Sequence, residues 1–157
     1  MRGLYAIVDV DTLAATSFDV VAFARSVLRA RPAALQLRAK HLEARETLAL
    51  LRALVPVCRQ AGTPLFANDR VDLAVLAGCE GVHIGQADVP FELGQRIAPK
   101  LAFGISTHDL AQLDRALAMR PAYVAFGPVF ETHSKHAPDP VVGLELLRQA
   151  SQRARAA

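Results

Sequence analysis

The sequence predicts an α/β protein of the parallel (β/α)8 TIM-barrel type, of which about six βα units are present in this chain. Short apolar runs alternate with longer helical patterns throughout the 157 residues, and consecutive βα units require parallel strands because each crossover carries a helix. The runs are apolar on both faces, as expected for parallel strands covered on both sides. Polar residues close nearly every run, which favours a barrel over an open doubly wound sheet, where ligand contacts concentrate near one switch point.

The first unit joins a strand over residues 4–8 to a helix over about residues 18–31. The second joins a strand over residues 34–37 to a long helix over about residues 43–61, which Pro56 is expected to break near its middle. Apolar positions of this long helix recur at helical spacing, namely Leu48, Leu51, Leu54 and Val55.

The remaining four units repeat this pattern. Their strands are predicted over residues 65–67, 81–84, 101–105 and 123–126, and their helices over residues 71–77, 91–97, 109–119 and 143–153. The loop 127–142 exceeds the roughly 12–15 residues at which connections without secondary structure become uncommon, which favours a lid or binding role.

The length predicts a single barrel domain over residues 1–157 that lacks the last two βα units, because a closed barrel of this type has eight. The first and sixth strands would then be unpaired edges, which favours self-association as a homo-oligomer or pairing with another chain.

Composition excludes several classes of protein. The net charge is +3, but the chain has no Trp and its basic residues are not interleaved with aromatic ones, so no nucleic-acid partner is expected. Apolar runs fall well short of the roughly 18 residues of a membrane span. Cys58 and Cys79 follow no metal or disulfide pattern, which predicts reduced thiols and a cytoplasmic protein.

Cations gather where strands end, although lysine is scarce. Two of the three lysines, Lys40 and Lys135, stand in these segments. Gln36, Arg38 and Lys40 alternate, so on a strand they point to the same side, toward the barrel interior. Buried charges are costly without a partner, so this pattern predicts either a bound anion or an internal ion pair with a carboxylate such as Asp69.

Carboxylates follow the third and fourth strands. Asn68 and Asp69 end the third, and Asp88 follows the fourth. A carboxylate pair with open positions suits Mg²⁺, which completes its shell with waters and substrate phosphates. Helix capping is the alternative for all of these residues, and for Ser106 as a capping box with Asp109.

Histidines and hydroxyls complete the set. His108 either transfers protons at the rim or lies exposed at a helix start, whereas His83, inside a strand, is expected to be packed or hydrogen-bonded in the core. His133 and His136 lack a third metal ligand, so a metal site there is disfavoured. They flank two hydroxyls and an ammonium, those of Thr132, Ser134 and Lys135.

Several segments together resemble the thiamine-phosphate synthase family. The specific ones are Asn68-Asp69-Arg70-Val71-Asp72 and Gly81-Val82-His83-Ile84-Gly85-Gln86; the others are Leu4-Tyr5-Ala6-Ile7, Leu35-Gln36-Leu37-Arg38-Ala39-Lys40, Gly104-Ile105-Ser106-Thr107-His108 and Phe126-Gly127-Pro128-Val129-Phe130. The resemblance spans the chain and implies a transferase that joins hydroxymethylpyrimidine diphosphate to thiazole phosphate, giving thiamine phosphate and diphosphate.

The resemblance also implies roles for individual residues. The pyrimidine diphosphate would be held by Gln36, Arg38, Lys40 and Asn68, and Mg²⁺ by Asp69 and Asp88. Ser106 would contact the pyrimidine side, Thr132 and Ser134 the thiazole phosphate, and Lys135 the diphosphate. Lys135, Arg38 and Lys40 would act in catalysis by stabilising charge on the leaving group.

The chain departs from the family pattern mainly at its end. The family continues with two more strands and a Gly-Gly turn that binds the thiazole phosphate. Glu131 and Ser134 stand where Pro and Thr are common. Two alternatives therefore remain: a thiazole tautomerase of the same fold, which relies on a rim histidine and lacks the carboxylate pair, or an inactive truncated barrel that binds a ligand or partner.

Overall fold

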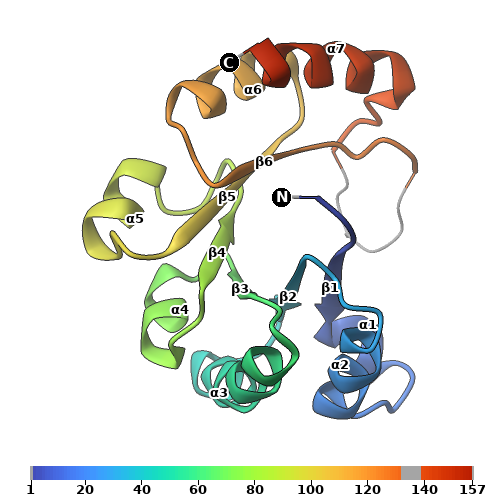
Figure 1. Cartoon of the computed structure of the whole chain (residues 1–157), viewed down its shortest axis with the longest axis vertical. Helices are drawn as coiled ribbons and strands as arrows, with labels where there is room; N and C mark the ends of the chain where they lie inside the picture. Colours follow the sequence, from blue (N-terminus) through green and yellow to red (C-terminus); the bar gives the residue numbers. More distant parts are fainter. Residues whose placement is uncertain (1, 132–138, 157) are drawn as a thin grey trace.

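The fold is a curled sheet of six parallel strands with helices on its outer side (Figure 1). It was obtained as a computed structural model that describes residues 2–131 and 139–156. Every strand pairs in parallel with the next one along the chain. The predicted TIM-barrel type is thus confirmed, with six strands: β1 (Tyr5–Asp9), β2 (Ala34–Arg38), β3 (Leu65–Asn68), β4 (Gly81–Ile84), β5 (Ala102–Thr107) and β6 (Tyr123–Phe126).

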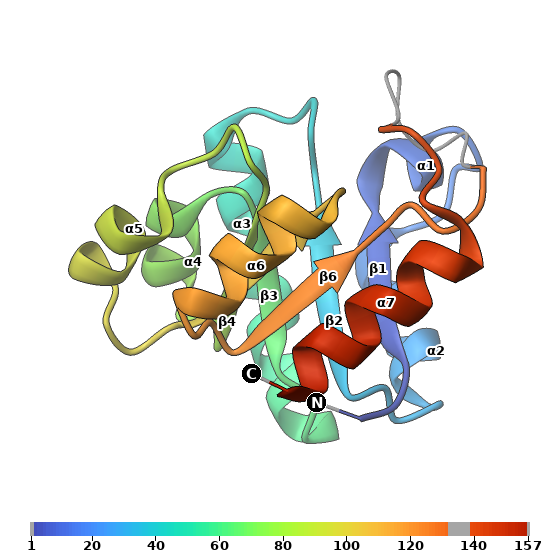
Figure 2. The same ribbon diagram turned by 90° about the horizontal axis from the view of Figure 1, so that it is seen from above.

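The helices lie outside the curl, as the view in Figure 2 also shows. They are α1 (Val10–Ala14), α2 (Val20–Leu28), α3 (Ala44–Ala61), α4 (Val71–Ala77), α5 (Phe91–Ile97), α6 (Leu110–Ala118) and α7 (Gly143–Ala156).

Two helices differ from the sequence prediction. The short helix α1 was not expected; it starts directly after β1 because the Asp9 carboxylate accepts a hydrogen bond from the Thr12 N–H at 3.0 Å. The predicted break at Pro56 is wrong, because α3 runs continuously from Ala44 to Ala61. A proline removes one intrahelical hydrogen bond, and apolar packing on both sides of Pro56, through Leu54 and Val57, holds the helix.

The core lies between the sheet and the helices. Leu35 and Leu37 of β2 are buried together with Leu51 and Leu54, which are one turn apart on α3. The apolar periodicity of α3 therefore buries one face of the helix against the sheet. Gly62 ends the helix in the left-handed conformation, with φ of 68°, which glycine adopts without steric cost.

The concave side of the sheet carries rings that pack over two glycines. A Cβ at Gly104 would lie 2.0 Å from the Tyr123 ring, and one at Gly81 would lie 2.2 Å from the Phe66 ring. The Phe66 and Tyr123 ring centroids are 5.6 Å apart, and Tyr5 lies 5.4 Å from Tyr123. Because glycine has no side chain, Gly81 and Gly104 leave room for this aromatic cluster inside the curl.

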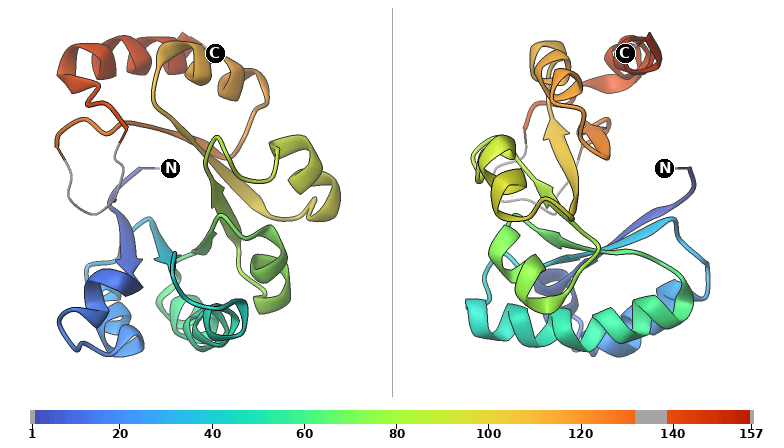
Figure 3. Two further views of the ribbon diagram at one scale, coloured as in Figure 1. Left: turned by 180° about the vertical axis from the view of Figure 1, so that it is seen from behind. Right: turned by 60° about the vertical axis from the view of Figure 1, so that its left-hand side comes forward.

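Strands β1 and β6 are the two edges of this sheet, as the sequence predicts (Figure 3). Ile7 on β1 is 54% exposed, so an apolar side chain lies open at one edge. The edges are linked by side chains, because the Tyr5 and Tyr123 hydroxyls are 2.7 Å apart.

Within residues 2–131 and 139–156, no helix has the length and apolar character needed to cross a membrane. Cys58 and Cys79 are both free and buried, as predicted. Burial raises the pKa of Cys58 to about 11 and that of Cys79 to about 12, so both are protonated, unreactive thiols at neutral pH.

Replacement of a core leucine on α3 tests this packing. Leu54 is fully buried, so Leu54→Ala is expected to lower the free energy of unfolding by about 2–5 kcal/mol in a urea titration. The matched control is Leu76→Ala on α4, where the side chain is 58% exposed and a change within about 0.5 kcal/mol is expected. Equal losses in the two variants would contradict the assigned core.

Candidate active site

A pocket of about 250 Å³ lies where β2 and β3 end. Four of the polar residues singled out from the sequence line it together, namely Lys40, Asn68, Asp69 and Asp88. Carboxyl ends of parallel strands meet at one edge of the sheet, which explains why residues so far apart in sequence converge here. These four contribute one ammonium, one amide and two carboxylates, and Arg70 and Thr47 line the pocket as well.

Asp69 is held in a strained backbone conformation. Its φ is +63°, which non-glycine residues rarely adopt, although Asp tolerates it better than most. The Asp69 N–H donates to the His83 carbonyl at 2.7 Å, which continues the β3–β4 ladder and fixes the strained residue. Such strain is typical of functional sites, where the surrounding structure imposes it.

The electrostatics of the pocket centre on Asp69. Burial raises the pKa of this carboxyl, the Lys40 ammonium opposes the shift, and the neighbouring Asp88 carboxylate adds to it. Asp88 is oriented by the Gly85 N–H, which donates to its Oδ2 at 2.7 Å. Two carboxylates are therefore held close together although they repel one another.

The capping interpretation is wrong for these carboxylates and for Ser106. Helix α4 has Arg70 as its N-cap, and α5 has Pro90, with no side-chain cap in either case. The cap of α6 is Asp109, whose carboxylate accepts from the Gln112 N–H at 2.7 Å. Ser106 lies inside β5, because this strand continues further than the sequence predicts.

Lys40 pairs with Asp69, which matches the internal ion pair considered from the sequence. Its side chain is 42% exposed, so the ammonium is not fully desolvated and its position at the pocket is compatible with ligand exchange. Gln36 and Arg38 alternate with Lys40 in the sequence, but neither of them lines this pocket.

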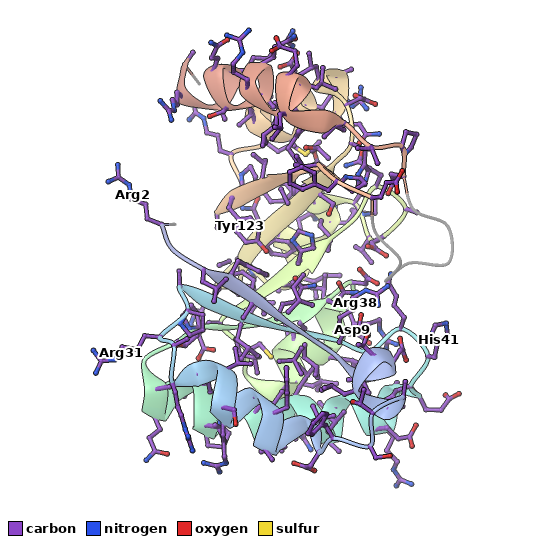
Figure 4. All side chains as sticks on the ribbon, turned by 90° about the vertical axis from the view of Figure 1, so that its right-hand side faces the viewer. Arg2, Asp9, Arg31, Arg38, His41 and Tyr123 are labelled. Carbon is purple, nitrogen blue, oxygen red and sulfur yellow. The ribbon has the colours of Figure 1, made fainter. Side chains whose placement is uncertain are left out.

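Arg38 instead pairs with Asp9, its neighbour in the β1–β2 register (Figure 4). Burial acts to raise the pKa of Asp9, but hydrogen bonds from Thr12 and Arg38 outweigh it and hold that pKa below its usual value. Asp11 lies 4.0 Å from Arg38 and 3.0 Å from His41. Sequence reasoning missed both aspartates, although Asp9 ends the first strand and Asp11 lies two residues later, where polar residues were noted at the ends of the other strands.

Deeper inside the curl, Gln36 is only 2% exposed and joins neighbouring strands. Its side-chain Oε1 accepts from the Tyr5 hydroxyl at 3.0 Å, and its Nε2 donates to the Asn68 side-chain Oδ1 at 2.6 Å. The His83 Nε2 lies 2.8 Å from the Ser106 hydroxyl, and its Nδ1 lies 2.8 Å from the Tyr123 hydroxyl. His83 was expected to be packed or hydrogen-bonded in the core, and the structure shows that it is hydrogen-bonded.

His108 contacts both ends of the loop that follows β6. Its Nδ1 lies 2.6 Å from the Gly127 carbonyl oxygen and its Nε2 lies 3.4 Å from an Asp139 carboxylate oxygen. The alternative of an exposed His108 is wrong, since its side chain is 16% exposed. The other candidates on this loop lie outside the described residues: Thr132, His133, Ser134, Lys135 and His136.

Comparison with known proteins decides the family. The family model described as thiamine monophosphate synthase matches residues 4–156. The chain belongs to the thiamine monophosphate synthase family. It is 42% identical to a thiamine-phosphate synthase of Koribacter versatilis, over 92% of this chain and 70% of that protein, and 41% identical to one of Roseiflexus sp., over 85% of this chain and 56% of that protein.

A solved structure of the family agrees with the fold. The thiamine phosphate pyrophosphorylase from Pyrococcus furiosus superposes with a TM-score of 0.85 at 31% identity. The superposition covers 96% of this chain and 69% of the Pyrococcus chain. The chain therefore spans between 56% and 70% of the length of these thiamine monophosphate synthase relatives.

The raised pKa of Asp69 predicts a stability change that depends on pH. The pKa of Asp69 is higher in the folded than in the unfolded state, so between these two pKa values the folded state binds more protons. The free energy of unfolding therefore falls as the pH rises through the raised pKa. Asp69→Asn removes that loss and keeps a residue that tolerates the positive φ. Without divalent cations at pH 7, the variant is expected to be more stable by about 0.5–2 kcal/mol in urea titrations, and the gain should vanish below the ordinary Asp pKa.

Asp72→Asn is the matched control for Asp69→Asn. The hydrogen bond from Arg70 holds the pKa of Asp72 below its usual value, so this carboxylate contributes stability above the unfolded pKa. Its replacement should not stabilise the protein at pH 7. A less stable Asp69→Asn variant at pH 7 would contradict the repulsion assigned to the two carboxylates in the pocket.

Proposed function

We propose that this protein is a thiamine-phosphate synthase, a transferase that joins hydroxymethylpyrimidine diphosphate to thiazole phosphate with release of diphosphate. The observation that carries the proposal is the shared pocket of Lys40, Asn68, Asp69 and Asp88 in a member of this family. The proposed substrates are small molecules, and the pocket offers both a cation for phosphate oxygens and carboxylates for a metal.

We propose Mg²⁺ as the cofactor. Among the described residues no group of three or more His, Cys, Asp or Glu side chains gathers around one point. A pair of carboxylates suits Mg²⁺ nevertheless, because this ion keeps several waters and takes substrate phosphates as ligands. Asp69 and Asp88 fit this role, since burial and mutual repulsion make an added cation favourable there. When bound, Mg²⁺ would neutralise charge on the diphosphate.

In the proposed reaction the diphosphate leaves from the pyrimidine methylene, and the thiazole nitrogen takes its place. Lys40 stabilises negative charge as it grows on the leaving group, which is the kind of term that dominates many enzyme reactions. Arg38 is proposed to act with it. The Arg38 guanidinium carries five N–H donors, and the structure assigns Nη1 to Asp9, which orients the group near the end of β2.

The proposed roles of the remaining residues follow from position or from the family. Gln36 and Asn68 are proposed to hold the pyrimidine diphosphate, and Ser106 to contact the pyrimidine side. Thr132 and Ser134 are proposed for the thiazole phosphate, and Lys135 as the third catalytic cation, on a segment outside the described residues. The carboxylate pair argues against the thiazole tautomerase, which lacks it.

The arrangement of the whole protein is also a proposal. We propose one barrel domain, located in the cytoplasm, and self-association through the edges β1 and β6, where Ile7 is exposed. Sedimentation equilibrium that shows a monomer at all concentrations would exclude the association.

Substitution of a pocket lysine tests the diphosphate site. Lys40→Ala is expected to weaken binding of hydroxymethylpyrimidine diphosphate in the presence of Mg²⁺ by about tenfold or more in calorimetry, because a charge-assisted hydrogen bond contributes about 1.5–3 kcal/mol. Lys100→Ala is the matched control, because Lys100 is exposed and precedes β5 at the opposite end of the sheet. An equal effect of both substitutions would show that net charge alone attracts the ligand.

Substitution of the carboxylates tests the metal assignment. Asp69→Asn and Asp88→Asn are each expected to abolish the gain in affinity that Mg²⁺ gives to pyrimidine diphosphate binding, and to lower Mg²⁺-dependent diphosphate release by about 100-fold or more, since even residues that only support metal ligands contribute about 10–100-fold. Asp72→Asn, on the exposed start of α4, should behave as the parent protein. Retained Mg²⁺ dependence in both pocket variants would overturn the assignment.

A further inference from the structure

Each of the six strands contributes one side chain to a single chain of hydrogen bonds inside the curl. The members in hydrogen-bonding order are Asn68 of β3, Gln36 of β2, Tyr5 of β1, Tyr123 of β6, His83 of β4 and Ser106 of β5. The links are between 2.6 and 3.0 Å long. This series of hydrogen bonds, which we call the interior relay, begins at Asn68, which lines the pocket described above, and ends at Ser106.

The direction of the interior relay follows from counting protons. Gln36 donates through Nε2 to Asn68, so its carbonyl oxygen accepts the Tyr5 proton. A phenol has one proton to donate, so Tyr5 must accept from Tyr123 in the 2.7 Å contact between them. Burial raises the pKa of Tyr5 to about 12 and raises that of Tyr123 as well, so both phenols keep their protons at neutral pH.

The same count continues to Ser106. The Tyr123 hydroxyl donates its one proton to Tyr5, so in its contact with His83 it accepts from Nδ1–H. A neutral imidazole that carries its proton on Nδ1 has an acceptor at Nε2, and this nitrogen lies 2.8 Å from the Ser106 hydroxyl. With His83 in this neutral form, the Ser106 hydroxyl donates its proton to Nε2. The Ser106 oxygen then offers only lone pairs to a ligand.

Local packing holds the relay in place. The His83 and Tyr123 rings are stacked, with centroids 5.6 Å apart and an angle of 15° between their planes. Gly104 leaves room for the Tyr123 ring, which a Cβ there would meet at 2.0 Å. At the far end, the Gln86 side chain donates to the Ser106 carbonyl oxygen at 2.6 Å, which fixes the backbone of that residue.

We infer that the interior relay fixes His83 in its Nδ1–H tautomer and makes Ser106 an acceptor-only group, so that the site selects a pyrimidine that presents an amino N–H and rejects one that presents a carbonyl. Tyr5 and Tyr123 are positioning residues in this scheme, since they act on the ligand through His83 and Ser106. The specificity rests on the proposed function, whereas the tautomer does not.

The tautomer is measured directly by ¹⁵N NMR of the protein labelled at histidine. His83 is expected to show a protonated Nδ1 and an unprotonated Nε2 at neutral pH, with its signals assigned by their loss in His83→Gln. A protonated Nε2, alone or together with a protonated Nδ1, would overturn the inference, because Ser106 would then be free to act as a donor.

A substitution tests whether the relay sets the tautomer. Tyr123→Phe removes the acceptor for Nδ1–H but keeps the ring, so the Nδ1–H signature is expected to give way to a mixture of tautomers. Phe66→Leu is the control, since Phe66 packs against Tyr123 with centroids 5.6 Å apart and lies outside the relay. It should leave the signature unchanged. An unchanged signature in Tyr123→Phe would overturn the role of the relay.

Ligand preference is the functional readout. In calorimetry with Mg²⁺, the protein is expected to bind 4-amino-5-hydroxymethyl-2-methylpyrimidine diphosphate at least about tenfold more tightly than its 4-oxo analogue, because the wrong ring leaves polar groups unpaired. Tyr123→Phe should reduce that ratio by about tenfold, and Phe66→Leu should not. Equal affinity of the parent protein for both rings would overturn the selectivity. Failure to bind either ring would count against the proposed function, and the tautomer measurement would still decide the relay.

Discussion

The hydrogen bond between Tyr5 and Tyr123 is the contact on which the interior of this protein depends. Strands β1 and β6 are the edges of the sheet, so no backbone ladder joins them, and the two hydroxyls at 2.7 Å link them instead. The contact requires Gly104, because any side chain there would occupy the space of the Tyr123 ring. The same contact therefore joins the two edge strands, packs the aromatic rings and links the hydrogen bonds of the interior. A substitution that removes it would affect all three.

The site is divided into a charged rim and a neutral interior. At the rim, Lys40 and Asp69 are paired. Burial disfavours the ionised form of Asp69, and the nearby Asp88 carboxylate disfavours it further. A bound cation would reduce the repulsion between the two carboxylates, and phosphate groups would pair with Lys40, whereas a neutral ligand would do neither. Below the rim, Gln36 and the phenols satisfy each other without any charge, which avoids the large cost of burying ions. In the proposed function, the charged groups at the rim would bind the diphosphate, and the directed hydrogen bonds of the interior would select the pyrimidine ring.

Sequence patterns predicted the strands to within one or two residues, because apolar runs and the glycines and prolines that bound them are local signals. They failed where a capping hydrogen bond or a tertiary contact decides the structure. Helix α1 depends on a cap by Asp9, the last residue of a strand, and α3 continues through Pro56 because buried neighbours hold it. The pairing of Arg38 with Asp9 depends on the register between β1 and β2, which no local pattern specifies. The sequence could therefore identify polar strand ends but not their partners.

The interior relay shows a second limit of sequence reasoning. Tyr5 and Tyr123 have the pattern of ordinary core aromatics, and His83 that of a core histidine. Their importance lies in the direction of the hydrogen bonds that they make. Each hydroxyl has one proton, so the orientation of the Gln36 amide determines which partner donates in every contact from Tyr5 to Ser106. Such a constraint passes along five contacts with no movement of the backbone. In the inference drawn from the interior relay, Tyr5 and Tyr123 thus influence which ligand is accepted without touching it, since they fix whether Ser106 offers a proton or a lone pair.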